Sequence, residues 1–172
     1  MKFGSVKNII FIAAAIVVGG LLLPEKLVMP VQGATSHDWN RKSFWYAPWG
    51  VSGVHKGIDI FAPAGKPAVA SVTGVVVYSG QFGIGGNVVA ILGPKWRIHY
   101  YAHLAEKGVT TLSIVNQGDV VGKVGTTGSA AGKPPHLHYA VLSLLPLPWL
   151  ATSATQGWKR MFFLDPAALL TR

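Results

Sequence analysis

The stretch PPHLHYAV, residues 134–141, places a histidine on each side of Leu137. Side chains of a strand point alternately to its two faces, so an extended conformation puts His136 and His138 on one face and Leu137 in a core. The chain has only six histidines. Taken alone, the pair is compatible with a site for imidazole chemistry or with surface histidines on an edge strand.

Short apolar runs of the same kind fill the region from residue 28 to residue 145. They are PAVASV (67–72), GVVVYSG (74–80), GGNVVAILG (85–93), WRIHYYAHL (96–104), GDVVGKVG (118–125) and HLHYAVLSL (136–144). β-branched and aromatic residues bounded by Gly and Pro, without a sustained helical period, are typical of strands. Residues 28–145 are therefore predicted to form one mostly antiparallel β domain.

The N-terminal segment, residues 1–27, has a different composition. Lys2 and Lys7 precede the uncharged apolar run from Ile9 to Leu23, which predicts a hydrophobic helix whose basic end stays in the cytoplasm. The run has a length between those of a signal-peptide core and a spanning helix. No Ala-x-Ala cleavage site follows it, which favours an uncleaved membrane anchor over a signal peptide. We expect an exported protein, either anchored in the inner membrane and facing the periplasm or cell wall, or secreted.

Residues 146–172 form an apolar, aromatic C-terminal extension. Its last part, DPAALL (165–170), predicts a short helix with Asp165 as N-cap and Pro166 at the first helical position. The extension is expected either to pack on the β domain or to contact the membrane surface.

Composition narrows the possible partners and chemistry. The chain has 172 residues, with 15 Lys and Arg against 6 Asp and Glu and a formal charge of +9, which favours an anionic partner such as a phospholipid or a wall polymer. Nucleic acid is not predicted, because the basic residues are scattered and no nucleic-acid-binding motif accompanies them. The absence of cysteine excludes disulfides, thiolate metal sites and a cysteine nucleophile.

A second motif supplies further candidate metal ligands. In HKGIDI (55–60), Gly57 and two isoleucines favour extended backbone, so His55 and Asp59 are expected on one face. HYYAHL (99–104) adds His103. Imidazoles and a carboxylate are the nitrogen and oxygen ligands of a catalytic zinc, which has three protein ligands and a fourth position for water.

Four motifs, in this order, resemble those of the M23 family of zinc metallopeptidases, also described as LytM-like or lysostaphin-type. HKGIDI is similar to the family's H-x-x-x-D element and YYAHL to its tyrosine-x-histidine-leucine strand. GDVVGKVGTTGSAAG (118–132) is similar to its glycine-rich hairpin, and HLH to its closing H-x-H. The resemblance implies an antiparallel sheet sandwich with a groove, and an endopeptidase that cuts peptide bonds in bacterial peptidoglycan.

The resemblance also implies roles for individual residues. His55, Asp59 and His138 would bind Zn²⁺, and His103 and His136 would stand beside the metal as catalytic groups. One imidazole can shuttle a proton while the other donates a hydrogen bond to the developing oxyanion. Which of the two histidines has which role stays open, as does the peptide bond that is cut.

Other residues are assigned with alternatives. His99 and Tyr101 alternate with His103, so they are expected on its face and are assigned to substrate binding, with strand packing as the alternative. His37 is expected at the surface, and Asp119 is expected to stabilise a turn. Five aromatic residues could form a groove wall or pack within a loop: Trp39, Phe44, Trp45, Tyr46 and Trp49.

Two other functions remain compatible with the motifs. One is a catalytically inactive LytM-like domain that binds the wall or activates an amidase. The other is an M23-type peptidase that acts on a protein substrate. Zinc binding and cleavage of purified peptidoglycan distinguish them.

Overall fold

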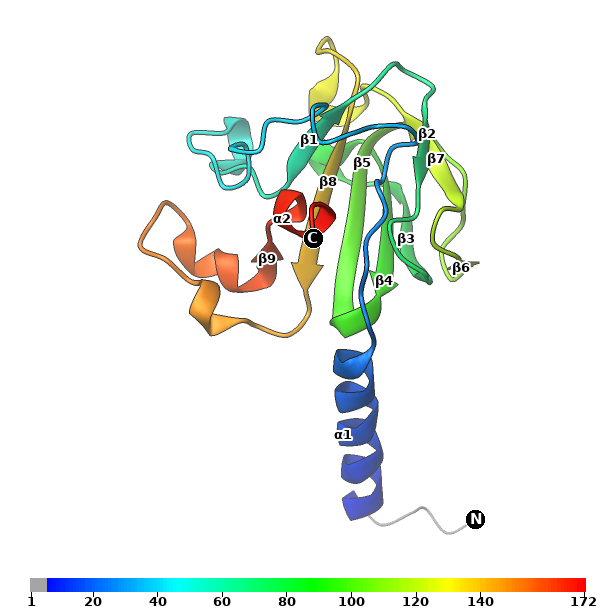
Figure 1. The fold of residues 1–172 in the computed structure, drawn as a ribbon, viewed down its shortest axis with the longest axis vertical. Coiled ribbons are helices and arrows are strands. Elements are labelled where there is room, and N and C mark those ends of the chain that lie inside the picture. Colours follow the sequence, from blue (N-terminus) through cyan, green and yellow to red (C-terminus); the bar gives the residue numbers. More distant parts are fainter. Residues whose placement is uncertain (1–5) are drawn as a thin grey trace.

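The computed structural model describes residues 6–172, so Lys2 and the rest of residues 1–5 lie outside the described part (Figure 1). Two α-helices and nine strands occur within residues 6–172. The helices are α1 (Val6–Leu22) and α2 (Pro166–Leu170). The strands are β1 (Ile58–Phe61), β2 (Pro67–Val69), β3 (Gly74–Gln81), β4 (Asn87–Gly93), β5 (Arg97–Lys107), β6 (Ile114–Val115), β7 (Val120–Val124), β8 (His136–Ser143) and β9 (Phe163–Leu164). Short 3₁₀ helices lie at Gly50–Ser52, Gly83–Gly85, Pro94–Trp96, Gly128–Ala130, Pro148–Leu150 and Gly157–Phe162.

The strands of residues 6–172 belong to one antiparallel sheet. Six follow the order β1-β8-β5-β4-β3-β6, β9 pairs with β8, and β2 pairs with β7. Strand β5 connects the parts, because its first residues lie between β4 and β8 while residues 104–107 pair with β7. The prediction of a mostly antiparallel β domain is confirmed.

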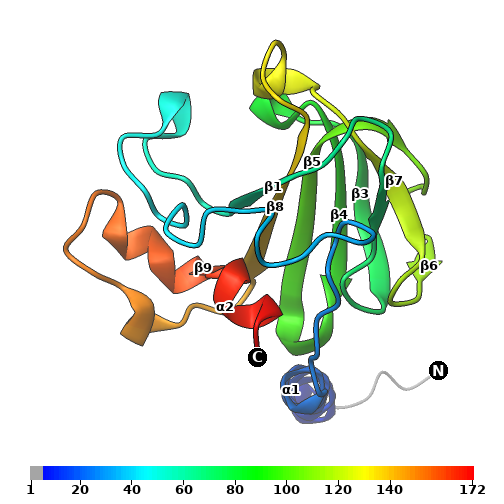
Figure 2. The ribbon, with the colours of Figure 1, turned by 45° about the horizontal axis from the view of Figure 1, so that its top comes forward.

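The sheet is curved (Figure 2). It encloses one hydrophobic core. Side chains from β1, β3, β4, β5, β7 and β8 and from β2 meet in a single cluster, so the two layers of the expected sandwich are parts of one sheet. In β8, Leu137, Tyr139 and Val141 are fully buried in this cluster. Leu137 therefore points into the core, as the alternation in HLH predicts.

Helix α1 extends away from the β domain, and its apolar side chains are largely exposed (Figure 1). No helix within residues 6–172 combines the length and the apolar character needed to cross a membrane. The indole of Trp96 donates a hydrogen bond to the Val17 carbonyl oxygen at 2.8 Å. A Cβ at Gly20 would overlap the Trp96 ring, so glycine permits this contact. The Glu25 carboxylate then pairs with Arg97, which fixes the end of the segment at the start of β5.

The C-terminal extension packs on the β domain. Strand β9 pairs with β8 through Val141 opposite Leu164, and two residues of α2, Ala167 and Leu169, lie in the hydrophobic cluster. The Asp165 side chain accepts a hydrogen bond from the Ala167 amide at 3.0 Å, so the predicted N-cap is confirmed.

Candidate active site

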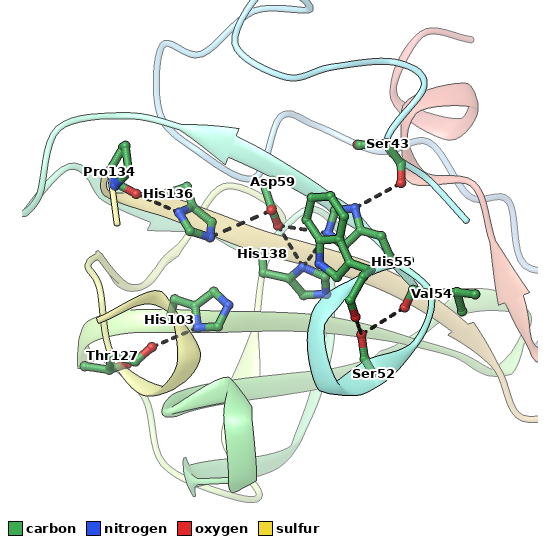
Figure 3. Close-up of polar contacts among 11 residues, drawn as sticks. Ser43, Ser52, Val54, His55, Asp59, His103, Thr127, Pro134, His136 and His138 are labelled. Carbon is green, nitrogen blue, oxygen red and sulfur yellow. Dashed lines mark hydrogen bonds and ion pairs between the residues drawn. The ribbon is translucent and has the colours of Figure 1, made fainter. Parts of the chain in front are cut away.

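Three ligand-type atoms from His55, Asp59 and His138 converge at one end of the sheet (Figure 3). His55 Nε2 lies 3.1 Å from Asp59 Oδ1 and 3.1 Å from His138 Nδ1, and His138 Nδ1 lies 2.8 Å from Asp59 Oδ1. Pairing between β1 and β8 sets this arrangement, because Asp59 is directly opposite His138. His55 reaches the same point from the loop before β1.

The protonation of His55 suits a metal ligand. Its Nδ1 lies 3.1 Å from the Ser43 carbonyl oxygen, which can only accept, so Nδ1 carries the proton and Nε2 keeps a lone pair in the neutral ring. That lone pair faces a carboxylate oxygen and a second ring nitrogen. Three electron-rich atoms so close together are stabilised by a shared cation, and metal-bound histidines usually donate their other N–H to such a carbonyl.

Two further features prepare this cluster for a metal. Burial alone would raise the pKa of Asp59, but its polar contacts with the His138 and His55 rings outweigh burial and hold the pKa well below its usual range. The carboxylate is therefore ionised at neutral pH. A Cβ at Gly57 would overlap the Tyr139 carbonyl oxygen and lie 3.0 Å from the His138 ring, so glycine is needed for the close approach of this loop.

His103 and His136 stand beside the three converging atoms without joining them. His103 Nδ1 donates to the Thr127 carbonyl oxygen at 2.9 Å, and His136 Nδ1 donates to the Pro134 carbonyl oxygen at 2.8 Å. Each ring therefore has Nε2 free of that bond. The two ring centroids are 5.1 Å apart, and His136 Nε2 is 3.9 Å from Asp59 Oδ2. Burial, and secondarily repulsion by His138, lower the pKa of His103 to about 4, so this ring is neutral at neutral pH.

Strand β5 reaches His103 through an irregularity that alternation does not predict. His103 has a φ of 63°, and the pairing of β5 with β7 shifts register between Leu104 and Glu106. Positive φ is rare for residues other than glycine and often marks functional sites. It places the His103 ring toward the groove, on the side of Tyr100 and Ala102.

The expectation that His99 and Tyr101 share the face of His103 is therefore wrong. Tyr101 is fully buried in the core, and its hydroxyl accepts a hydrogen bond from the Ser71 amide at 2.7 Å. His99 is also fully buried, and its Nδ1 is 2.8 Å from the Tyr139 hydroxyl. Their neighbour Tyr100 lines the groove instead. Burial raises the pKa of Tyr100 to about 12, so its phenol stays a hydrogen-bond donor at neutral pH.

A groove of about 410 Å³ leads to these histidines. One wall is the loop from Pro48 to Lys56, and the other contains Ile84, Gly85, Ser129 and Lys133. A second hollow is lined by Lys42, Tyr46, Trp49, Asp59 and Phe61. Trp49 lines both, so an extended chain placed along them passes the converging ligand atoms.

The aromatic residues before His55 divide between the two roles left open by the sequence. Trp49 forms groove wall and stacks on the His55 ring, with centroids 4.1 Å apart and planes at 22°. Tyr46 and Trp49 both border the second hollow. Trp39 is buried in the core, whereas Trp45 packs against Phe163 of the C-terminal extension.

Two residues lie where the sequence predicts them, outside the site. His37 is exposed. Asp119 accepts a hydrogen bond from the Asn116 amide at 2.7 Å, which is a turn-stabilising contact.

Two imidazoles and a carboxylate at the floor of an open groove define a metal-dependent hydrolase type of site. The family model of peptidase family M23 matches residues 53–144, slightly more than half of the chain. The chain belongs to peptidase family M23.

Individual relatives agree with this assignment. The chain is 40% identical over 113 residues to the L-Ala--D-Glu endopeptidase of Bacillus subtilis (strain 168), covering 60% of this chain and 35% of the relative. It is 41% identical over 88 residues to the peptidoglycan DD-endopeptidase ShyC of Vibrio cholerae, covering 51% of this chain and 20% of the relative. The chain thus spans about a third or less of the length of these curated relatives.

The fold is also similar to that of a solved peptidase. The catalytic domain of lysostaphin, an antimicrobial peptidase from Staphylococcus simulans, superposes with a TM-score of 0.61 at 25% identity, covering 80% of this chain and 96% of that domain.

Tyr100 and Lys56 line the groove but were not identified from the sequence. The signal for Lys56 was its place beside His55 in HKGIDI. Tyr100 gave no signal, because regular alternation places it on the face opposite to His103. The positive φ that brings both residues to the groove occurs at a histidine, not at a glycine or asparagine that would have indicated it.

Proposed function

We propose that this protein is a zinc-dependent endopeptidase that hydrolyses peptide bonds in bacterial peptidoglycan. The observation that carries the proposal is the convergence of His55, Asp59 and His138 beside two further histidines with free Nε2 atoms, in a chain of the M23 family. The names of the Bacillus and Vibrio relatives support peptidoglycan as the substrate.

His55, Asp59 and His138 would hold Zn²⁺, because the His₂Asp set offers three converging nitrogen and oxygen donors and leaves a side open to the groove. When bound, zinc supplies Lewis acidity, which polarises a scissile carbonyl and lowers the pKa of water toward about 7. The contact between His55 Nδ1 and Ser43 keeps Nε2 directed at the donor cluster.

His103 and His136 would be the catalytic groups. A neutral Nε2 can accept a proton from the attacking water and return it to the leaving amine, and a protonated Nε2 can donate a hydrogen bond to an oxyanion. The low pKa of His103 keeps its ring neutral at neutral pH, so that Nε2 has a lone pair. Backbone carbonyls at Thr127 and Pro134 hold both rings in the orientation that presents Nε2.

We also propose that the chain works outside the cytoplasm. Peptidoglycan lies there, and the apolar N-terminal segment is suited to export or anchoring. The formal charge of +9 would favour association with an anionic wall.

Digestion of purified sacculi tests the proposed activity. The zinc-loaded protein should release soluble fragments with new amine ends, identified by mass spectrometry, and a chelator should abolish the release until zinc is restored. Stoichiometric zinc binding without any new amine ends would reject the proposal in favour of a wall-binding domain. New ends in a protein substrate but none in sacculi would assign the peptidase a protein substrate.

A further inference from the structure

The groove beside the candidate metal site carries two lysines from different parts of the chain. Lys56 belongs to the loop that carries His55, and Lys133 to the loop before β8. No acidic side chain of residues 6–172 is part of the lining of this groove. Its charged groups are therefore cationic.

The acidic residues of the chain are engaged elsewhere. Six acidic side chains occur in the sequence. Their contacts are Glu25 with Arg97, Asp38 with the Thr35 amide, Asp59 with the clustered histidines, Glu106 with Lys123, Asp119 with the Asn116 amide, and Asp165 with the Ala167 amide. Within the described part of the chain, no carboxylate makes an ion pair with Lys56 or Lys133.

Lys56 is held in position rather than free to turn away. It is half-buried, and its ammonium donates one hydrogen bond to the Ser52 carbonyl oxygen at 2.9 Å. Two of its three N–H donors remain for another acceptor.

Lys159 reaches this region from the C-terminal extension. Its ammonium donates to Gln156 Oε1 at 3.0 Å, and Gln156 Nε2 donates to the same Ser52 carbonyl oxygen at 3.0 Å. The extension therefore adds a third positive charge near Lys56. These contacts build a partly desolvated cationic region whose missing partner is an anion.

We infer that the groove recognises peptides that carry a free carboxylate near the scissile bond, with Lys56 and Lys133 as its binding groups. The inference rests on the proposed function and makes it more specific, because it selects anionic stem peptides of peptidoglycan over neutral glycine bridges. Ion pairing with a half-buried lysine also fixes the register of the peptide along the groove, which a neutral peptide would not obtain.

Binding of a matched peptide pair tests the inference. The probes are an N-acetylated stem peptide containing the L-Ala–D-Glu bond with free carboxylates, and the same peptide with every carboxylate converted to a carboxamide. Calorimetry with the zinc-free full chain prevents cleavage and prevents the carboxylate from binding zinc directly. We expect the acidic peptide to bind roughly threefold to tenfold more tightly, as for one partly desolvated ion pair.

Lysine variants locate the effect. Lys56→Gln and Lys133→Gln should each reduce the preference for the acidic peptide, and Lys56→Arg should retain it. Lys107→Gln removes the same charge from a surface hollow away from the groove and should leave the preference unchanged. Equal binding of both peptides to the unmutated chain, or an equal loss of preference in Lys107→Gln, would overturn the inference.

Sacculus digestion separates this inference from the proposed function. Cleavage of sacculi without a carboxylate preference would retain the enzyme and reject the cationic groove. A carboxylate preference that disappears in Lys56→Gln, without cleavage by the zinc-loaded chain, would retain the binding groove and reject the enzyme.

Discussion

His136 and His138 are two residues apart, but only His138 places a ring nitrogen among the converging ligand atoms. His138→Ala should therefore lose zinc together with activity, because one of three protein ligands is removed. His136→Ala should keep close to one zinc per chain while turnover falls about 10²–10⁴-fold, the usual effect of losing a proton-transfer or oxyanion group. The measurements are zinc per chain by mass spectrometry and peptidoglycan cleavage.

His103→Ala is the matched comparison, since His103 also lies beside the cluster. It should resemble His136→Ala in both measurements. Loss of zinc from His136→Ala but not from His138→Ala would invert the assigned roles, and retention of zinc in both would show that the metal site lies elsewhere.

A second prediction concerns pH. The folded pKa of His103 is about 4, below the ordinary value of 6.5, so the unfolded chain binds a proton at this residue before the folded chain does. The free energy of unfolding of the zinc-free protein should therefore fall as pH drops from 6.5 to 4. Urea unfolding at about pH 7.5 and about pH 5 should show a smaller fall for His103→Gln than for the unmutated chain.

The exposed His37 provides the control for that measurement. His37→Gln should leave the pH dependence unchanged. If His103→Gln and the unmutated chain lose the same free energy, the His103 ring is not the group whose low pKa destabilises the fold in acid.

At the residue scale, side-chain alternation predicted one strand well and failed in another. His136, Leu137 and His138 alternate as expected because β8 is regular there. His99 and Tyr101 were expected on the face of His103, but they lie on the opposite face. The reason is the positive φ of His103, which interrupts the alternation of side chains between Tyr101 and His103. Such a local reversal depends on the pairing of β5 with β7, so neighbouring residues in the sequence do not reveal it.

At the scale of elements, the C-terminal extension supports the loop that carries His55 (Figure 2). Gln156 donates to the Ser52 carbonyl oxygen, and the Trp45 indole donates to the Thr155 carbonyl oxygen at 3.1 Å. The extension lies beyond residue 144, where the family match ends. We therefore expect the position of Trp49 and Lys56 to depend on a segment outside the family match.

Gln156→Asn tests this support. Asn tolerates the positive φ of 53° at this position but is one methylene shorter, so the hydrogen bond to Ser52 should be lost. Zinc content should stay unchanged, while kcat/KM for peptidoglycan fragments falls about fivefold, as for one lost hydrogen bond.

The control is Gln32→Asn, at an exposed position outside both hollows. It should leave kcat/KM unchanged. Loss of zinc from Gln156→Asn would instead mean that the extension holds His55 directly, and an unchanged kcat/KM would show that the loop keeps its position without it.

The six apolar runs identified in the sequence correspond to β2, β3, β4, β5, β7 and β8. They were predictable because each has strand-forming residues bounded by glycine or proline. The pairing of β9 with β8 and the division of β5 between β8 and β7 were not predictable. Both depend on contacts between residues distant in the sequence, which local composition does not specify.

At the scale of the whole molecule, a further prediction concerns whether the N-terminal segment is kept after export. We expect the mature protein to keep its N-terminal segment and to remain with membranes through a carbonate wash. Contacts of Val17 with Trp96 and of Glu25 with Arg97 tie this segment to the β domain. N-terminal mass analysis that finds a new end between Pro24 and Ser36, with the protein soluble, would contradict the expectation.

The single hydrophobic core was predictable from length and apolar content, and the packing of the extension was one of two outcomes left open. Residues 167 and 169 of α2 lie in the same cluster as Val31, so the segments before and after the family match share one core. Length and composition could not distinguish packing from membrane contact, because both bury apolar side chains.

The ligand cluster and α1 lie at opposite ends of β5 (Figure 1). Arg97 is tied to Glu25, and His103 follows it by six residue positions along β5, which corresponds to a span of about 20 Å. If α1 is held in a bilayer, this span and the short segment between α1 and Glu25 set the distance between the ligand cluster and the membrane surface. Cleavage would then be confined to the peptidoglycan nearest the membrane. Lengthening the segment before Glu25 would let the enzyme cleave peptidoglycan farther from the membrane.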